Sequence, residues 1–358
     1  MKPQSRTISP YPHRLGGHCG SGAFRDLLEH QALDWGTPLN EGLVFALGGA
    51  LDLSYLRSDQ LVPPVYLVGR GADMELDLPQ RLGGHVEVRK TDEPSEGWEW
   101  VRSEINRGHP VLVWADIAEL PYLRVRLQMS RHDIVIIGYD DSLQVAHVVD
   151  NDRVDVQEVP YDALARARHS QGFPGPNRHA TYFIDWPEEL PPLAPLAAEA
   201  FQQAAATMRS TGGQQIATLP GALGATGLDA ASLFAGDIAA WPDELDPDTL
   251  DVALRSLGAF VEKAGTGGGL FRRLLADGAR DIAAIVEEPG VAIVASAALA
   301  CADRWSDVAA LAGARDVDLS TRAHDAAAAA SDLTELENAL ADALDAAARL
   351  LDEQGASA

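Results

Sequence analysis

The sequence predicts an α+β domain that carries a cysteine nucleophile, followed by an all-α domain. A cysteine stands in the glycine-rich run 16–22, directly before a helical pattern. Strand-like runs follow in the first half, with a histidine and an aspartate at their ends. After a proline-rich stretch the chain becomes rich in Ala and Leu at helical spacing. A length of 358 residues provides about two domains, each with its own core.

The first predicted element is a helix that begins at Cys19 and ends near His30. Its apolar positions recur at helical spacing, and they are Ala23, Phe24, Leu27 and Leu28. A helix N-terminus lowers the pKa of a thiol, because its free N–H groups and its dipole favour negative charge. Gly20 and the other glycines around it leave N–H groups for an oxyanion, and Ser21 belongs to the same candidate segment. The alternative is a buried structural cysteine at a helix start.

Three later runs predict strands, and the last two form a hairpin. The runs are 111–116, 133–139 and 144–150. His132 precedes the first strand of the hairpin and Asp150 ends the second, so we expect them side by side. A carboxylate beside an imidazole holds the ring in one tautomer, as a general base requires. Asp116, at the end of the first run, is a further candidate near the site.

Ordinary roles compete with this interpretation, because a histidine can cap a strand and an aspartate can begin a loop. Asp152 competes with Asp150 for the place of the acid, and Asp133 is a weaker rival. We favour Asp150 because it directly continues its strand. His18 is adjacent to Cys19, but neighbouring residues diverge at a helix start, so a histidine distant in sequence is the expected base.

The domain boundary is expected at a run that contains four prolines. The run 180–186 predicts a final strand, and the prolines that follow exclude a regular helix. We therefore expect a catalytic domain at 1–186, a stiff linker at 187–195 and a helical domain at 196–358. Leucines over 325–353 predict one or two amphipathic helices. These pack in an intramolecular bundle or, as the alternative, pair between the subunits of a homodimer.

The helical half contains a candidate anion site. The glycine-rich run 265–269 precedes Arg272 and Arg273, which could receive the phosphate of a pantetheine arm. The run lacks the Gly-Lys-Ser/Thr ending of a nucleotide-binding loop, and a simple loop between helices is the commoner explanation.

Glu41 and the histidines are the remaining polar candidates. Glu41 stands inside an otherwise apolar helical run, where it needs a buried partner or points into a cleft. The histidines show no paired metal spacing, so neither a metal nor another cofactor is expected.

The charge balance limits the expected partners. The formal net charge is −25, from 53 acidic and 28 basic residues. Nucleic acid and anionic membrane are not expected partners, because basic side chains drive phosphate binding. A cationic substrate would be steered towards an acidic cleft, whereas an acidic carrier protein would be repelled unless a local basic patch receives it.

Several features predict a cytoplasmic protein. Cys19 and Cys301 lie in different halves and give no disulfide framework, which suits a reducing compartment. The N-terminus lacks the apolar stretch of a secretory signal. The longest apolar run, 291–302, is shorter than the about 20 residues that span a bilayer.

Two segments resemble a known family. Segment 18–28 reads HCGSGAFRDLL and segment 39–49 reads LNEGLVFALGG, and both resemble the BtrH family, whose namesake is the acyltransferase of butirosin biosynthesis. The resemblance to the BtrH family continues through 110–114, 120–122 and the strand of His132. In the second half, 265–273 and 304–307 are similar to the helical domain that commonly follows a BtrH-type domain. The resemblance implies a papain-like fold for the first domain, with Cys19 as nucleophile, His132 as base and Asp150 as its partner.

The resemblance also implies a reaction. The donor would be a carrier-protein or coenzyme A thioester, and the acceptor a natural-product amine such as an aminoglycoside or a peptide. Related papain-like peptidases usually carry a Gln shortly before the Cys, whereas 11–14 reads YPHR here. The oxyanion donor is thus unassigned and peptidase activity is less expected. A cysteine hydrolase with the same triad and a non-catalytic binding module of the same fold are the alternatives.

Overall fold

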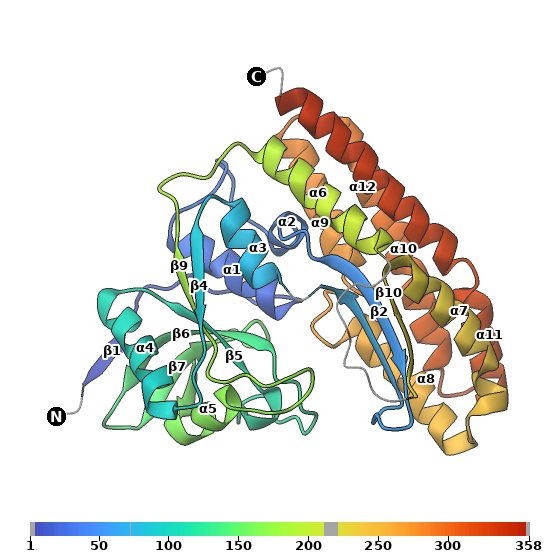
Figure 1. Cartoon of the computed structure of the whole chain (residues 1–358), viewed down its shortest axis with the longest axis horizontal. Coiled ribbons are helices and arrows are strands. Elements are labelled where there is room, and N and C mark those ends of the chain that lie inside the picture. Colours follow the sequence, from blue (N-terminus) through green and yellow to red (C-terminus); the bar gives the residue numbers. More distant parts are fainter. Residues whose placement is uncertain (1–3, 72, 211–220, 356–358) are drawn as a thin grey trace. The chain divides into compact units, whose positions relative to one another are not determined.

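The computed structural model describes residues 4–71, 73–210 and 221–355 of the chain. They form two compact units, and the chain passes between the units more than once (Figure 1). The first unit contains the residues up to Leu39 and Pro79–Leu190. The second contains Asn40–Leu78 and the residues from Pro191 on.

An antiparallel sheet is the framework of the first unit. Its strand order among the described residues is β4-β9-β5-β6-β7-β8, and β1 pairs with β6. The strands are β1 (Ser5–Thr7), β4 (His85–Arg89), β5 (Val111–Ala115), β6 (His132–Asp140), β7 (Val145–Val149), β8 (Gln157–Pro160) and β9 (Thr181–Asp185). The runs predicted at 111–116, 133–139, 144–150 and 180–186 correspond to β5, β6, β7 and β9. The predicted final strand, β9, lies inside the sheet between β4 and β5.

Helices cover the sheet of the first unit. They are α1 (Cys19–His30), α4 (Pro94–Arg107), the 3-10 helix η1 (Ile117–Glu119) and α5 (Tyr161–Arg168). The core between β5, β6, α4 and α5 is apolar and fully buried, with Val113 and Ile134 at its centre. Helix α1 packs against β6, which brings the start of α1 to the end of the sheet where β6 begins.

The β6–β7 hairpin closes through its turn. The Asp140 carboxylate accepts hydrogen bonds from the N–H groups of Ser142 (2.7 Å) and Leu143 (3.1 Å). This use of a short acidic side chain is typical of tight turns. The register pairs Val135 with Val149, so the chain beyond β7 continues beside the first residues of β6.

The second unit is mostly helical, with one small sheet of order β10-β2-β3. Its strands are β2 (Leu51–Arg57), β3 (Val65–Arg70) and β10 (Leu223–Thr226). Its helices are α2 (Glu41–Leu47), α6 (Leu193–Arg209), α7 (Gly227–Glu244), α8 (Pro247–Glu262), α9 (Arg272–Ile285), η2 (Pro289–Val291), α10 (Ala292–Ala312), α11 (Leu319–Ala330) and α12 (Leu333–Gly355). A further helix, α3 (Met74–Arg81), contains the point where the chain leaves this unit.

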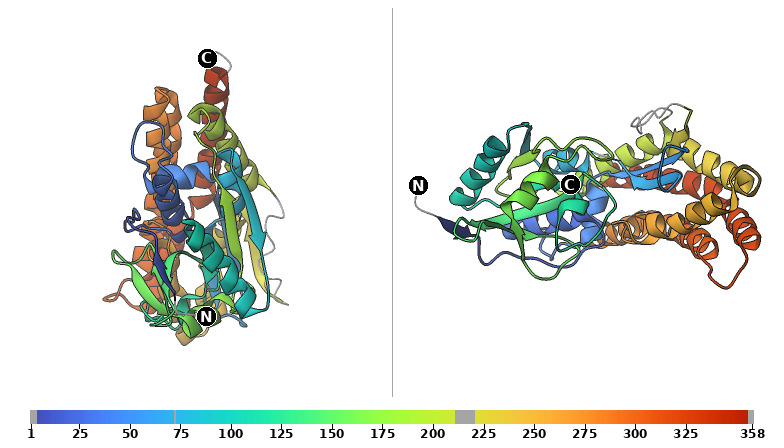
Figure 2. Two further views of the ribbon diagram at one scale, coloured as in Figure 1. Left: turned by 90° about the vertical axis from the view of Figure 1, so that its left-hand side faces the viewer. Right: turned by 90° about the horizontal axis from the view of Figure 1, so that it is seen from below.

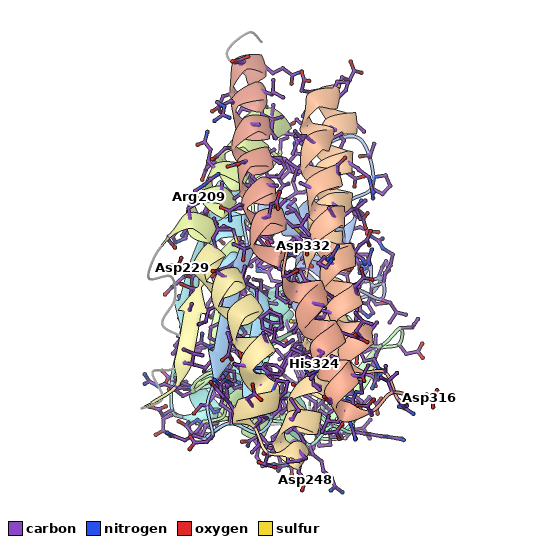
Figure 3. The ribbon with its side chains drawn as sticks, turned by 90° about the vertical axis from the view of Figure 1, so that its right-hand side faces the viewer. Arg209, Asp229, Asp248, Asp316, His324 and Asp332 are labelled. Carbon is purple, nitrogen blue, oxygen red and sulfur yellow. The ribbon has the colours of Figure 1, made fainter. Side chains whose placement is uncertain are left out.

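Helices α6 and α12 lie side by side (Figures 1 and 2). At the end of α6, Arg209 pairs with Asp342 (2.6 Å) and Asp345 (2.5 Å) of α12. Figure 3 shows Arg209 on this flank of the helices. The stretch 325–353 thus falls in two helices, α11 and α12, and most of its leucines are buried within this unit, namely Leu333, Leu340, Leu344 and Leu351. The structure therefore shows the predicted intramolecular bundle.

Each compact unit consists of two separate segments of the chain, whereas the predicted boundaries give each domain one continuous segment. Segment Asn40–Leu78 belongs to the helical unit, although it precedes most of the first sheet in sequence. The physical reason is that β2 pairs with β10, a strand from the second half of the chain. The expected linker also ends early, because α6 begins at Leu193 and includes Pro195 in its first turn, where no backbone N–H is needed. The sequence domains at 1–186 and 196–358 stay a prediction.

No helix within the described ranges is long and apolar enough to cross a membrane.

Candidate active site

The site begins at the N-terminus of α1. His18 is the cap residue, with extended backbone, and its Nδ1 accepts a hydrogen bond from the N–H of Ser21 (3.2 Å). The Ser21 hydroxyl lies 3.0 Å from the same nitrogen. Cys19 is the first residue of the helix and is buried. The cap fixes the thiol at the positive end of the helix dipole, where a negative charge is favoured.

His132 and Asp150 form the second part of the site. The Nε2 atom of His132 lies 2.8 Å from Oδ2 of Asp150, and Asp150 is fully buried. The hairpin register explains the contact, because Asp150 follows directly after Val149, which pairs with Val135. Asp150 therefore lies on the same side of the hairpin as His132, one diagonal step away. His132 also hydrogen-bonds with Cys19, so the imidazole connects the thiol to the carboxylate.

The charges in the site favour a thiolate and an imidazolium. Burial raises the pKa of the Cys19 thiol, but the neighbouring rings of His18 and His132 outweigh it and bring that pKa well below its ordinary value. Burial lowers the pKa of His132, but the Asp150 carboxylate and the Cys19 thiolate outweigh it and raise that pKa well above its ordinary value. Both shifts favour the charged forms of the pair, a Cys19 thiolate and a His132 imidazolium.

Asp150 is held by more than the histidine. Its Oδ2 also accepts a hydrogen bond from the Tyr122 hydroxyl (2.6 Å), and its Oδ1 accepts one from the N–H of Asp152 (3.2 Å). Burial raises the pKa of Asp150, but His132 and these hydrogen bonds outweigh it, so the pKa lies below its ordinary value. The Asp152 side chain is 62% exposed and pairs with Arg153. The structure therefore brings Asp150 to His132, and not Asp152.

Asp133 lies on the thiol side of the site, which the sequence did not predict. Its Oδ2 accepts from the Cys19 thiol at 3.7 Å, and the side chain is buried. The sequence suggests Asp133 only as a rival of Asp150, but neighbouring residues of a strand point to opposite faces. That alternation, together with the packing of α1 on β6, is the signal that could have placed it.

Two further expectations about the helix start are corrected or refined. His18 does not diverge from the thiol, because it both caps α1 and hydrogen-bonds with Cys19. Gly20 is required by close packing: a Cβ atom there would lie 3.1 Å from Oδ2 of Asp133 and 3.1 Å from Cε1 of His18. Any side chain at this position would push one of these groups away from the thiol.

Hydrogen bonds join the loops that carry the three residues. The N–H of Gly16 donates to the Asn151 carbonyl (3.0 Å), and the Asn151 side chain donates back to the Gly16 carbonyl (3.0 Å). His13 bonds the Arg153 carbonyl through Nε2 (2.7 Å), and Arg153 donates to the Tyr122 carbonyl (2.8 Å). The segments before Cys19, before His132 and after Asp150 are thus fixed to one another.

The structure places Asp116 and Glu41 at the starts of helices. Asp116 is fully buried and caps η1, where it accepts hydrogen bonds from the N–H groups of Ala118 and Met129 and from the Ser170 hydroxyl. Oδ1 thus fixes the loop between β5 and β6, and Oδ2 joins it to the segment after α5, so Asp116 supports the structure. Glu41 is the first residue of α2, not an interior one, and belongs to the second unit. Its placement near the site stays a prediction.

The expectation that Arg272 receives an external phosphate is wrong. Its guanidinium is fully buried and makes two hydrogen bonds with Glu337, each of 3.0 Å. It also donates to the carbonyls of Asp52, Gly69 and Leu270. Arg273 is partly exposed and bonds Ser306 and Asp303. The glycine-rich turn ahead of α9 therefore ends in a structural ion pair.

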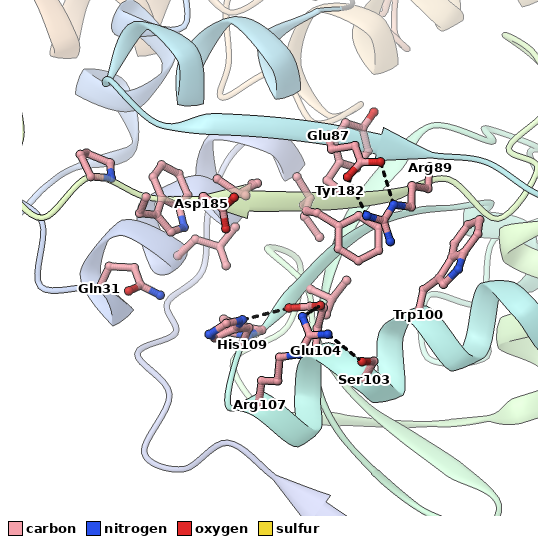
Figure 4. A pocket seen from close by; sticks show the side chains of 18 of the residues that line it. Gln31, Glu87, Arg89, Trp100, Ser103, Glu104, Arg107, His109, Tyr182 and Asp185 are labelled. Atoms are coloured by element: carbon pink, nitrogen blue, oxygen red, sulfur yellow. Dashed lines mark hydrogen bonds and ion pairs between the residues drawn. The ribbon is translucent and has the colours of Figure 1, made fainter.

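A cavity of about 660 Å³ lies elsewhere in the first unit. Its walls come from the C-terminal end of α1, the end of α4, and strands β4 and β9 (Figure 4). Charged pairs occupy the walls, including Arg89 with Glu87 and His109 with Glu104. None of Cys19, His132 and Asp150 lines it. The thiol site and this cavity are separate features of the unit.

The site defines a class of chemistry. A thiol at a helix start, an imidazole in contact with it and a buried carboxylate behind the imidazole are the parts that nucleophilic thiol chemistry uses. No group of three or more His, Cys, Asp or Glu side chains in the described part of the chain is arranged to hold a metal ion.

Two family models match the chain. Residues 18–151 match the model described as butirosin biosynthesis protein H, N-terminal, and residues 162–344 match a domain of unknown function, DUF4872. The chain belongs to the DUF4872 family and carries a BtrH-type N-terminal domain. The resemblance found in the sequence is thereby confirmed. A comparison with curated proteins found no match.

Proposed function

We propose that this protein is a cysteine-dependent N-acyltransferase of natural-product biosynthesis. The observation that carries the proposal is the 2.8 Å contact between His132 and Asp150 beside the Cys19 thiol. The name of the matching N-terminal family, which refers to butirosin biosynthesis, supports a biosynthetic enzyme. A papain-like fold is part of the proposal, supported by a helix that begins at the cysteine and packs on an antiparallel sheet.

In the first half-reaction the Cys19 thiolate attacks the carbonyl carbon of an acyl thioester. A tetrahedral oxyanion forms and collapses, so the bond between the acyl carbon and the donor sulfur breaks. The departing thiolate takes the proton of the His132 imidazolium. The products are an acyl-Cys19 enzyme with neutral His132 and the free donor thiol, from a carrier protein or coenzyme A.

In the second half-reaction an amine attacks the acyl-enzyme. Neutral His132 takes a proton from the attacking nitrogen, and Asp150 stabilises the imidazolium that forms. The bond between the acyl carbon and Cys19 breaks, which gives an amide and restores the thiolate and imidazolium. The acceptor is a small natural-product amine. Neither step requires a cofactor.

The oxyanion donors follow from the helix start. The first N–H groups of an α-helix have no acceptor within the helix. The N–H of Ser21 is taken by the His18 ring and that of Gly22 by the His18 carbonyl. We therefore assign the oxyanion to the N–H groups of Cys19 and Gly20, the remaining donors in the first turn of the helix. This replaces the Gln that related peptidases use.

Both cysteines are free, which fits a reducing compartment such as the cytoplasm. They also provide the first test. Alkylation of Cys19 should begin at a pH well below the about 8.5 of a free thiol, whereas burial raises the pKa of Cys301. Mass spectrometry reads both sites in one sample. His132→Gln should move the onset for Cys19 to higher pH, and an unchanged onset would remove the base from the proposal.

The transfer itself is tested with a small acyl donor. An N-acetylcysteamine thioester should add one acyl group to Cys19, and an added amine should release it as an amide. Release as the free acid, at the same rate with and without amine, would instead make the protein a hydrolase that uses the same residues. If Cys19 is alkylated at low pH but is not acylated by the thioester, a non-catalytic binding module becomes the better explanation.

A further inference from the structure

Arg168, the last residue of α5, is a buried arginine that contacts no carboxylate among the described residues. Its guanidinium donates only to neutral acceptors, which are the Gly97 carbonyl (3.2 Å), the His179 carbonyl (3.0 Å) and the Thr181 hydroxyl (2.7 Å). In the same described part of the chain, its Nε atom has no hydrogen-bond partner. Burial without a counter-charge lowers the pKa of Arg168 to about 9. A buried charge of this kind is unfavourable unless an opposite charge joins it.

Other buried arginines of the chain have the carboxylate that Arg168 lacks. They contact it at 3.0 Å or less, and the pairs are Arg25 with Asp26, Arg272 with Glu337 and Arg322 with Asp251. Asp92 acts electrostatically on the neighbouring His179, but it is exposed and both of its oxygens accept from Arg178 (2.9 and 3.0 Å). Asp92 is therefore already neutralised by another arginine.

A cavity of about 40 Å³ lies beside this unpaired charge. Arg168 and His179 line it, and Trp98 and Leu164 contribute apolar walls. His179 is 1% exposed, and its Nε2 atom has no hydrogen-bond partner within the described ranges. A cavity needs about 10–15 Å³ to admit one water molecule, so this one has room for a small ion. Apolar walls lower the local dielectric constant, which strengthens the attraction between a guanidinium and an anion.

The charges around the cavity favour an ion with a single negative charge. Burial and the charge of Arg168 lower the pKa of His179 to about 4. The imidazole is therefore neutral at neutral pH, and its Nε2 can donate a hydrogen bond without adding a second positive charge. One guanidinium charge is then left to be balanced.

We propose that Arg168 and His179 form a binding site for a small monovalent anion, of the size of chloride or formate. The anion lies in the cavity, where it balances the guanidinium charge and accepts from the His179 ring. Because Arg168 also donates to Gly97 of α4 and to Thr181 of β9, the anion stabilises the place where α4, α5 and β9 meet. Neither the thiol nor its partners line this cavity, so the site is independent of the proposed acyl transfer.

Thermal melts of the full chain test the site. Sodium chloride or sodium formate replaces sodium gluconate at constant ionic strength, and gluconate, which is too large for the cavity, serves as the inert anion. The melting temperature should rise and then level off, by about 3–6 °C at about ten times the dissociation constant. The anion that acts at the lower concentration is the preferred ligand. Melting temperatures that are the same in all three salts overturn the proposal.

Substitutions assign the response to the cavity. Arg168→Met should abolish it, whereas Arg166→Met, which removes the same charge from an exposed position of α5, should retain it. Ala165 also lines the cavity, so Ala165→Leu should fill the space and abolish the response while the guanidinium stays in place. This second variant decides the question if Arg168→Met does not fold. A response that survives in folded Arg168→Met or in Ala165→Leu overturns the proposal.

Diffraction locates the ion. Bromide substitutes for chloride and scatters anomalously, so wild-type crystals grown in sodium bromide should show a peak in the cavity beside Arg168. The bromide concentration is chosen from the melts, at the level where the response has saturated. Water alone in the cavity at that concentration overturns the proposal.

Discussion

Tyr122 and His132 meet the same carboxylate oxygen of Asp150, at 2.6 Å and 2.8 Å. The tyrosine comes from the loop after β5 and the histidine from the start of β6, so the oxygen joins two segments that flank the site. A carboxylate that accepts two such hydrogen bonds is favoured in its charged form. Tyr122 therefore acts on the thiol through Asp150 and His132, as a positioning residue.

Tyr122→Phe should slow Cys19 acylation by an N-acetylcysteamine thioester about tenfold, because a hydrogen bond to a charged group is lost. The variant also removes an interaction that lowers the pKa of Asp150. That pKa should rise, so the acid side of the pH–rate profile should move to higher pH. Tyr161→Phe, which loses a bond to Asp141 instead, is the control. A slower rate without this pH shift would mean that Tyr122 only supports the fold.

Cys19→Ala should lower the pKa of His132, because the thiolate is one of the groups that raise it. NMR titration of the imidazole measures the change, and Cys301→Ala should leave it unaltered. The raised pKa also has a consequence for folding. Its stabilisation is fully present below the ordinary value of 6.5 and is lost as the pH rises through the folded value. In Cys19→Ala the loss should be complete at a lower pH and smaller in total, and thermal melts across the pH range test it.

Gly20→Ala should raise the pKa of Cys19 and reduce acylation, because the new methyl group meets Asp133 and His18 at 3.1 Å. The pH dependence of alkylation reports the pKa directly. Gly258→Ala provides the contrast, since a Cβ atom there meets nothing within 4 Å. That change should stabilise α8 by about 1 kcal/mol and leave the thiol unchanged. If the pH dependence of Cys19 alkylation is unchanged in Gly20→Ala, Asp133 and His18 can move aside without affecting the thiol.

Glu337→Leu should destabilise the protein by about 3–5 kcal/mol, because it leaves the Arg272 guanidinium buried without its counter-charge. The variant also removes the acceptor of the Trp305 indole N–H (2.7 Å). Arg272→Met combined with Glu337→Leu should recover much of the loss. Denaturant titrations of Glu337→Leu, Arg272→Met and the double variant complete a double-mutant cycle. Additive losses would contradict a coupled pair.

The sequence was informative where chemistry depends on local pattern. Cys19 could be predicted at a helix start from the residues that follow it, and His132 and Asp150 from the two ends of one hairpin. Tyr122 and Asn151 could not be predicted, because their contacts depend on how loops close in space.

In the second unit, the partners of buried residues lie far away in the sequence and could not be predicted. Arg272 follows a run of glycines, which suggests a ligand, but its partner Glu337 lies 65 residues further along the chain. A helical pattern does not reveal which distant residue will face a buried charge. Segment Asn40–Leu78 was assigned to the first domain for a similar reason, since its strand pattern does not show where its pairing partner lies.

The pairing of β2 with β10 has a consequence for synthesis on the ribosome. Tyr55 of β2 pairs with Ala225 of β10, so the small sheet cannot be completed until β10 has left the ribosome. Every residue of the first unit is made by Leu190, earlier than that strand. The first unit can therefore fold before the small sheet closes. During that time segment Asn40–Leu78, which carries β2, connects two parts of the first unit without its own final strand partner. Such late pairing of distant segments is slow, and it exposes an unpaired strand edge to other nascent chains in the meantime.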